Sequence, residues 1–169
     1  MLNTAVISID KKNKKAKLSN EMEIEYEYLI NTIPLNKFLN IHKGYDSLIE
    51  KMSYNKVLVF NLGFDKKSPL CTKEHWLYIP SKECNFYRCG FYDNILGTDK
   101  LSMYIEIGYN KNDEITEEEI NKQLKLTLEN LLHMGIITEN MNLKEYVSLI
   151  ISEGFSAEYA TFKTSAKLK

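Results

Sequence analysis

The sequence predicts an α+β fold: a mainly antiparallel sheet of about five to seven strands with helices packed on one face, plus an N-terminal β-hairpin or meander. Three observations support this class. Short segments alternate between apolar and polar residues, as half-buried strands do. The nearly continuous apolar run 56–64 indicates a central strand buried on both sides. A segment that starts at Thr116 repeats its apolar residues at helical spacing.

The first third of the chain predicts a small β-meander. Residues 4–9 alternate, residues 11–15 form a charged turn, and residues 16–18 return as the second arm of a hairpin. Residues 23–28 alternate again, with glutamates on the solvated face, and an apolar stretch 29–33 stops at a proline. We therefore expect residues 1–33 to form one small unit.

The chain from Pro34 onward predicts a larger α+β unit over residues 34–162, followed by a frayed tail over 163–169. Proline suits the first turn of a helix, and the apolar residues that follow it keep helical spacing. A short amphipathic helix is expected at 45–52. The expected strands after the central one are 75–79, 86–92 and 101–108.

The clearest helix begins at Thr116, which forms a capping box with Glu119. Gly135 is placed to end this helix. The stripe expected to pack on the sheet consists of Ile120, Leu124, Leu128, Leu131 and Leu132. Residues 142–151 fit either a capped helix or a strand, and the pattern does not choose between them.

Composition and charge exclude several classes of function. The net charge is −1 and the isoelectric point is about 6.3, which argues against nucleic-acid binding through a basic field. No apolar run approaches the length of a membrane span, and the first ten residues are too polar for a signal peptide. We therefore expect a cytoplasmic protein. The seven glycines are scattered, so no phosphate loop or dinucleotide fingerprint can be drawn through them.

The three cysteines favour free thiols over a metal site. Cys71, His75, Cys84 and Cys89 could in principle bind zinc, but they lack the two tight pairs typical of structural zinc sites. A strand expected between His75 and Cys84 would also hold them apart. Buried or half-buried thiols in a reducing compartment are the better interpretation, and no metal is expected.

The strand faces suggest where a ligand could bind. Trp76 and Tyr78 share one face of their strand, Arg88 and Tyr92 share a face of the next, and Tyr104 shares a face with Glu106 of a third. Arg88 is the only arginine among 22 basic residues. If the strands are neighbours, aromatic rings can stack on a ligand while the arginine binds an anion or carboxylate. The alternative is a half-exposed sheet face with ordinary aromatic pairs.

Three stretches in order resemble the flavin-dependent amine oxidases of the protoporphyrinogen-oxidase-like group, relatives of UDP-galactopyranose mutase. Residues Glu25-Tyr-Glu-Tyr-Leu-Ile-Asn-Thr-Ile-Pro-Leu35 resemble the "YDxLIxTxPL" segment of that group. Val57 to Gly63 is similar to its "vnlG" strand. His75-Trp-Leu-Tyr-Ile-Pro80 and Phe86-Tyr-Arg-Cys-Gly-Phe-Tyr-Asp-Asn94 resemble its "WxYxP…fyRvgfysN" segment.

This resemblance implies the middle of a larger FAD-dependent enzyme. Residues 1–33 would correspond to the end of an FAD-binding domain and 34–162 to the substrate domain. In an intact member, Thr32 and Pro34 would lie near the FAD. The residues that the resemblance implies on the substrate side are Trp76, Arg88 and Tyr92. Together with Tyr78 and Tyr104 from the strand faces, they are the expected substrate-binding residues.

The expected function is therefore that of a substrate-binding portion of an oxidoreductase or mutase. The substrate would be a small molecule, either an amine or nucleotide-sugar-like. The chain by itself lacks the glycine-rich cradle, so it is expected to hold no FAD and to be inactive alone. Its partner would be the FAD-binding portion. The alternative is a stand-alone, non-catalytic α+β module that binds a small anionic or sugar-nucleotide ligand.

Overall fold

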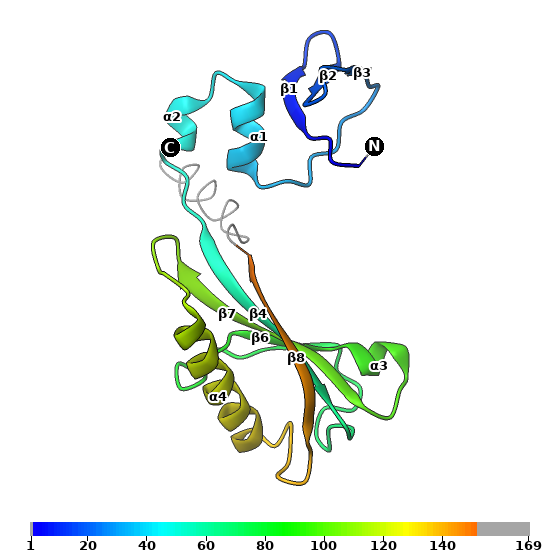
Figure 1. The fold of residues 1–169 in the computed structure, drawn as a ribbon, viewed down its shortest axis with the longest axis vertical. Helices are drawn as coiled ribbons and strands as arrows, with labels where there is room; N and C mark the ends of the chain where they lie inside the picture. Colours follow the sequence, from blue (N-terminus) through cyan, green and yellow to red (C-terminus); the bar gives the residue numbers. More distant parts are fainter. Residues whose placement is uncertain (1, 152–169) are drawn as a thin grey trace, which may run out of the picture. The chain divides into compact units, whose positions relative to one another are not determined.

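The computed structural model describes residues 2–151, which form two antiparallel sheets and four helices (Figure 1). This confirms the predicted α+β class. Contacts divide the chain into two compact units, one ending at Tyr54 and the other beginning at Asn55. In chain order the elements are β1 (Val6–Asp10), β2 (Lys15–Leu18), β3 (Glu23–Glu25), α1 (Leu35–His42), α2 (Asp46–Ile49), β4 (Asn55–Phe64), β5 (Trp76–Tyr78), β6 (Arg88–Phe91), α3 (Tyr92–Leu96), β7 (Leu101–Asn110), α4 (Glu117–His133) and β8 (Leu143–Ile151).

The first unit is a three-stranded meander in the order β1-β2-β3, packed against α1. Its small core consists of Ile9, Ala16 and Leu18 from the hairpin with Leu39 from the helix. The hairpin and the helix after Pro34 were both predicted from their spacing, and both are confirmed.

The third strand, β3, is shorter than its alternation predicts, because the strand β2 with which it pairs begins only at Lys15. Tyr26 donates its backbone N–H to the carbonyl of Lys14, which lies just before β2 begins, and no ladder continues beyond that bond. The expected strand 23–28 therefore ends at Glu25. Of the apolar stretch that follows, Leu29 and Ile30 are exposed.

The second unit is a five-stranded antiparallel sheet in the order β5-β6-β7-β4-β8. The apolar run predicted as a central strand is β4, which pairs along its whole length with β7 on one side and with β8 on the other. Residues 143–151 are therefore a strand, which decides between the two interpretations of this segment.

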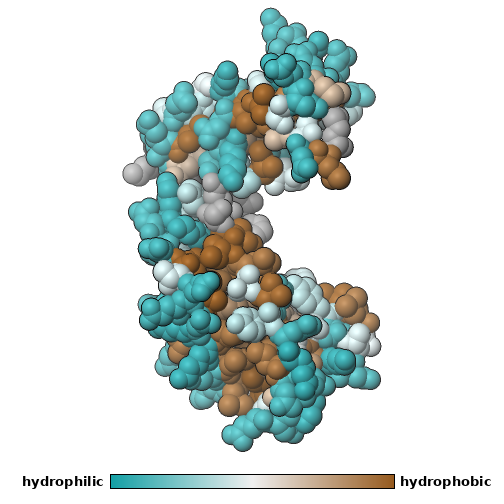
Figure 2. Space-filling model, in the orientation of Figure 1, coloured by the Kyte–Doolittle hydropathy of each residue, from teal (hydrophilic) through white to brown (hydrophobic). Residues whose placement is uncertain are grey.

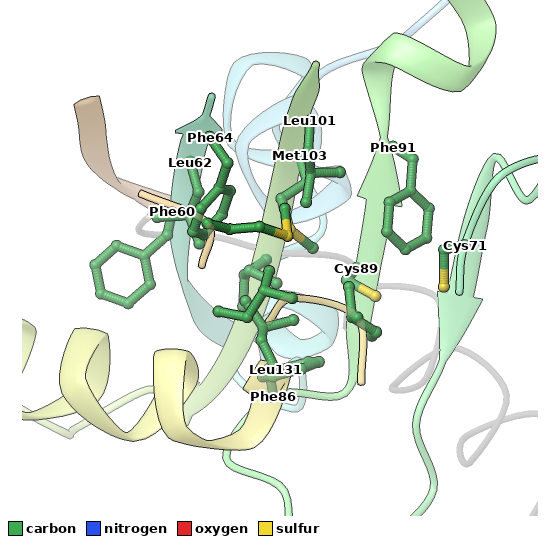
Figure 3. Packing of buried hydrophobic residues seen from close by; sticks show 14 of the residues in the cluster. Phe60, Leu62, Phe64, Cys71, Phe86, Cys89, Phe91, Leu101, Met103 and Leu131 are labelled. Atoms are coloured by element: carbon green, nitrogen blue, oxygen red, sulfur yellow. The ribbon is translucent and has the colours of Figure 1, made fainter. Parts of the chain in front are cut away.

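One face of this sheet carries the core, and α4 crosses it (Figures 1 and 3). The sheet contributes fully buried side chains such as Phe60, Met103 and Cys89, and α4 contributes Leu131. Burying large apolar side chains on one side of a sheet under a helix is the main stabilising term for such a layer. Leu132, which the stripe predicts as a packing residue, is instead 42% exposed because it lies on the flank of the helix.

The helix α4 begins and ends as the sequence predicts. The Thr116 side chain accepts a hydrogen bond from the backbone N–H of Glu119. At the other end Gly135 adopts a φ of +71°, and the N–H of Ile136 reaches back to the carbonyl of Leu131. This is a Schellman motif, in which a left-handed glycine lets the chain leave the helix.

The strand β8 forms one edge of the sheet and carries exposed apolar residues on both faces. Its side chains at Val147, Leu149 and Ile151 are about half exposed, as are those of Tyr146 and Ile150 on the opposite face. Figure 2 shows hydrophobic surface where β8 crosses the second unit in Figure 1. No helix of the described residues is long and apolar enough to span a membrane.

The division between the units differs from the expected boundary after residue 33. The helices α1 and α2 group with the N-terminal meander, because α1 packs on β1 and the two helices pack on each other. The last part of the expected unit 34–162 and the whole frayed tail 163–169 lie outside the described residues.

Candidate functional site

The face of the five-stranded sheet opposite the core gathers aromatic and polar residues from neighbouring strands. Strand register sets them in two adjacent rows, which we call the aromatic wall. The first row runs across Tyr78, Arg88, Glu106, Val59 and Leu149, and the second across Trp76, Gly90, Tyr104, Asn61 and Val147.

Arg88 lies at the centre of a hydrogen-bonded network in the first row. Its Nη2 donates to Oε1 of Glu106 in an ion pair, and its Nη1 donates to the hydroxyl of Tyr78 at 3.2 Å. The other carboxylate oxygen of Glu106 accepts a hydrogen bond from the Tyr87 hydroxyl at 2.5 Å. The Glu106 side chain is only 12% exposed and that of Arg88 is 23% exposed, so the pair is largely removed from water.

A β-bulge explains how Tyr87 and Arg88 come to share this face. The backbone N–H of Tyr87 donates to the carbonyl of Glu106, while Arg88 is the register partner of the same residue. Two residues on β6 and its lead-in thus oppose one on β7, as in a bulge. The side chains confirm it, because Phe86 and Cys89 are both buried in the core with two residues between them.

The second row is built around a ring that lies on a glycine. A Cβ added to Gly90 would stand 2.1 Å from Cε1 of Tyr104, so only glycine leaves room for this ring. The Tyr104 ring centroid is 5.5 Å from that of Tyr92, whose hydroxyl donates to Oδ1 of Asn61 at 3.0 Å. The guanidinium carbon of Arg88 lies 5.8 Å from the Tyr104 centroid, which connects the rows.

The electrostatics of the wall follow from these contacts. The hydrogen bond that Arg88 donates to Glu106 raises the pKa of Arg88 above its ordinary value, so the guanidinium stays charged. Partial burial and the hydrogen bond to Glu106 raise the pKa of Tyr87, and burial also raises that of Tyr104. Both phenols therefore stay protonated and can act as hydrogen-bond donors at neutral pH.

The structure brings together four of the predicted substrate residues through direct contacts. Tyr78 contacts Arg88, Arg88 lies over the Tyr104 ring, and Tyr104 packs against Tyr92. Trp76 lies in register with Gly90, on which the Tyr104 ring sits, and is 57% exposed.

The two predicted cofactor-contacting residues belong to the other unit. Thr32 is exposed in the segment after β3, and Pro34 is partly exposed at the residue preceding α1.

The strand predicted for 86–92 ends one residue early. Tyr92 is the first residue of α3 and not the last of the strand, because the chain turns into a short helix that Gly97 ends with a φ of +71°. Asp93 fixes this turn by accepting hydrogen bonds from the Thr98 hydroxyl and from the backbone N–H of Ser102.

Three residues of the wall escaped the sequence analysis. Tyr87 alternates out of phase with Arg88, and only the bulge returns it to the same face. Gly90 has no side chain to mark it, and Asn61 lies in an otherwise apolar run. The register between β4 and β7 was needed to place Asn61 beside Tyr104.

The cysteines do not add chemistry to the wall. Cys71 and Cys89 are buried in the core, Cys84 is half-buried, and all three are free. Burial raises the pKa of Cys89 to about 12, which makes it a poor nucleophile. Residues 2–151 hold no group of three or more His, Cys, Asp or Glu side chains able to bind a metal ion.

The described residues do not fit the pyrophosphate of FAD. A dinucleotide cradle needs a glycine turn that leads from a strand directly into a helix. Among the described glycines, those with positive φ are Gly44, Gly97 and Gly135; the last two end helices, and the first lies between α1 and the single-turn helix α2. The described residues therefore offer no such cradle, and we assign the wall no reaction step.

Comparisons with known proteins define the class of fold. No family model and no curated protein sequence matches the chain. Solved structures do match: reduced UDP-galactopyranose mutase has a TM-score of 0.69 and 21% identity over 97% of this chain and 38% of its own. A putative protoporphyrinogen oxidase from Exiguobacterium sp. has a TM-score of 0.58 and 13% identity, covering 98% of this chain and 40% of its own. An oxidoreductase from Methanosarcina mazei has a TM-score of 0.57 and 10% identity, covering 89% and 37%.

The chain thus has the fold of one part of these proteins, and it spans about two fifths of their length. The matches include the two families that the sequence motifs resemble. The resemblance to the protoporphyrinogen-oxidase-like and UDP-galactopyranose-mutase-like group is confirmed at the level of the fold.

Proposed function

We propose that this chain forms the substrate-side portion of an FAD-dependent oxidoreductase or mutase of the protoporphyrinogen-oxidase-like group, and that the aromatic wall is its substrate surface. The observation that carries the proposal is the wall itself. Four predicted residues, Tyr78, Arg88, Tyr92 and Tyr104, form one connected network on an open sheet face in a fold shared with such enzymes.

We further propose that the substrate is nucleotide-sugar-like and not a simple amine. One matching structure is a UDP-galactopyranose mutase, which favours this class. The chemistry of the wall supports it as well, because exposed rings such as Trp76 and Tyr78 offer flat apolar faces beside hydroxyl groups. Sugars present a similar mixture of C–H faces and hydroxyls. A primary ammonium group binds most strongly where a carboxylate is unpaired, and both oxygens of Glu106 already have donors.

The FAD, when bound to such an enzyme, supplies the electron or group-transfer chemistry. In the proposal it is held by polypeptide other than residues 2–151, with the segment around Thr32 and Pro34 running beside it. The role of this chain is to bind and orient the substrate. We therefore expect the chain alone to be inactive.

Trp76 provides a direct test, because it is the only tryptophan of the chain and is largely exposed. UDP-galactose added to the purified chain should change its fluorescence and saturate, and benzylamine should not. Tyr78→Ala should weaken the binding of UDP-galactose. Tyr28→Ala is the matched control, since Tyr28 is equally a surface tyrosine but lies in the first unit.

Two outcomes would overturn this proposal. Saturable binding of benzylamine without binding of UDP-galactose would contradict the substrate class. Stoichiometric FAD in the purified chain, visible in its absorbance spectrum, would contradict the claim that the cofactor is held elsewhere. The alternative of a stand-alone binding module predicts the same binding of UDP-galactose but no gain of activity when an FAD-binding portion from a matching enzyme is added.

A further inference from the structure

We propose that Glu106 neutralises Arg88 inside the aromatic wall, so that the wall takes the uncharged, hydroxylated ring of a ligand and not its phosphate groups. The inference rests on the proposed function of the wall as a ligand-binding surface, and it goes beyond it by naming the part of the ligand that binds there. It also changes the role expected for the single arginine, which the sequence alone suggests as an anion-binding group.

Both terminal nitrogens of the Arg88 guanidinium already have hydrogen-bond partners. One terminal nitrogen pairs with the Glu106 carboxylate and the other donates to the Tyr78 hydroxyl. Each terminal nitrogen keeps a second N–H, but the buried Nε has no hydrogen-bond partner among the described residues and its edge of the guanidinium is closed to solvent. A bidentate phosphate would therefore have to use the two nitrogens that already hold Glu106 and Tyr78, and would compete with both.

The Glu106 carboxylate is held in place from its other side. The Tyr87 hydroxyl donates to the carboxylate oxygen that Arg88 leaves free, at 2.5 Å. Tyr87 reaches this face because of a bulge in the strand backbone, and the backbone pairing with β7 fixes its position. Removing a carboxylate with two donors from a largely buried guanidinium would leave three polar groups unpaired, which is costly.

The wall has no net charge, and its exposed groups are mainly aromatic rings. The two register rows carry one positive and one negative charge, Arg88 and Glu106, and their formal sum is zero. The accessible groups are the rings of Trp76, Tyr78 and Tyr92, which are 57%, 62% and 40% exposed. The guanidinium carbon of Arg88 lies 5.7 Å from the Tyr78 centroid, so its positive charge is further shared with this ring. Such a surface suits the apolar face and hydroxyls of a sugar ring.

The test measures binding of two probes by Trp76 fluorescence: methyl β-galactoside, which is neutral, and inorganic pyrophosphate. The wild-type chain should bind the galactoside with little dependence on salt and should show no binding of pyrophosphate. Glu106→Gln keeps the shape and a hydrogen-bond acceptor but removes the negative charge. It should therefore gain the saturable binding of pyrophosphate that the wild type lacks.

The matched control is Tyr87→Phe, which removes a hydrogen bond from Glu106 but keeps the carboxylate charge; it should not gain pyrophosphate binding. The double variant Glu106→Gln with Arg88→Gln should lose the gain. Binding of pyrophosphate to the wild type that Arg88→Gln abolishes would overturn the inference and leave the proposed function standing. If neither the galactoside nor UDP-galactose binds, the proposed function fails.

A second measurement needs no ligand and separates the two failures. Arg88 is the only arginine, so its modification by phenylglyoxal can be followed by mass alone. The folded wild-type chain should react more slowly than the urea-unfolded chain, and Glu106→Gln should react faster than folded wild type. Equal rates of phenylglyoxal modification in the folded and the unfolded wild-type chain would overturn the neutralisation of Arg88. This result does not depend on which probe binds, and it needs only the wild-type chain, so it stands even if Glu106→Gln fails to fold.

Discussion

The same strands build both faces of the five-stranded sheet, but one face is a buried apolar core and the other is an exposed surface of aromatic and charged residues. The core face buries large apolar side chains such as Phe60 and Met103 completely beneath α4. The opposite face leaves rings exposed and satisfies its charges internally, through Arg88, Glu106 and Tyr87. Because successive residues of one strand point to opposite faces, strand alternation lets the same sheet build a buried core on one side and an exposed aromatic surface on the other.

The largest expected effect belongs to the core face. Phe60 is fully buried and lies in register between Ile105 and Ser148. Phe60→Ala should lower the free energy of unfolding by about 3–5 kcal/mol, because it removes apolar contacts and leaves a cavity. Urea unfolding followed by circular dichroism measures this loss. Its neighbour Val59, partly exposed on the opposite face, provides the control: if Val59→Ala costs as much, the faces do not differ as described.

The second largest effect on stability is expected at Gly90, where the Tyr104 ring packs directly on the backbone. Gly90→Ala places a methyl group on the Tyr104 ring and should cost about 1–3 kcal/mol of unfolding free energy through overpacking. The same substitution in a Tyr104→Ala background should cost much less, since the obstructing ring is gone. A double-mutant cycle by urea unfolding measures the coupling. Equal costs in both backgrounds would show that the ring does not rest on Gly90.

A smaller effect concerns the Tyr87 hydroxyl. Tyr87→Phe should cost about 1 kcal/mol at neutral pH, the value of an ordinary hydrogen bond. Because folding raises the pKa of Tyr87, the folded state holds this proton more tightly than the unfolded state. Its contribution is thus complete below the unfolded pKa of about 10 and is lost as the pH rises above it.

Unfolding curves at rising alkaline pH test this dependence. Wild-type stability should fall more steeply than that of Tyr87→Phe. Tyr109 provides a comparison outside the wall, because its pKa is also raised, by burial and by its hydrogen bond to Glu119. Removing both hydroxyls should flatten the curve further. Parallel curves for the wild type and Tyr87→Phe would contradict the raised pKa.

The smallest effect on stability is expected at the most exposed part of the wall. Trp76→Ala should change the free energy of unfolding by no more than about 0.5 kcal/mol, since 57% of the side chain is already in water. The same variant should lose binding of UDP-galactose, which calorimetry can follow without the fluorophore. A large loss of stability would assign Trp76 to the core and break the distinction between the faces.

The sequence predicted much of the fold because many of its signals are local. The strand β4 follows from a nearly continuous apolar run, and α4 follows from a capping box, a helical stripe and a terminal glycine. Each signal depends on residues within a few positions of one another. The prediction was weaker where pairing across the chain decides, as at residues 143–151, which became a strand because β4 offered an open edge.

The candidate site divides in the same way. The alternation within each strand correctly placed Tyr78, Arg88 and Tyr104 on one face, and the strands proved to be neighbours. It could not place Tyr87, because a bulge shifts the phase of alternation by one residue. It could not find Gly90 either, because the importance of a glycine lies in the ring that another strand lays over it.

The sequence by itself determined the α+β class, the main strands and helices, and the chemical character of the wall. It did so because hydrophobic periodicity and helix-capping residues act over short distances. Only the tertiary structure decided that Arg88 pairs with Glu106, that Tyr104 rests on Gly90, and that α1 and α2 belong with the meander. These features depend on residues brought together by sheet register and packing, and register is a property of the folded chain rather than of any one segment.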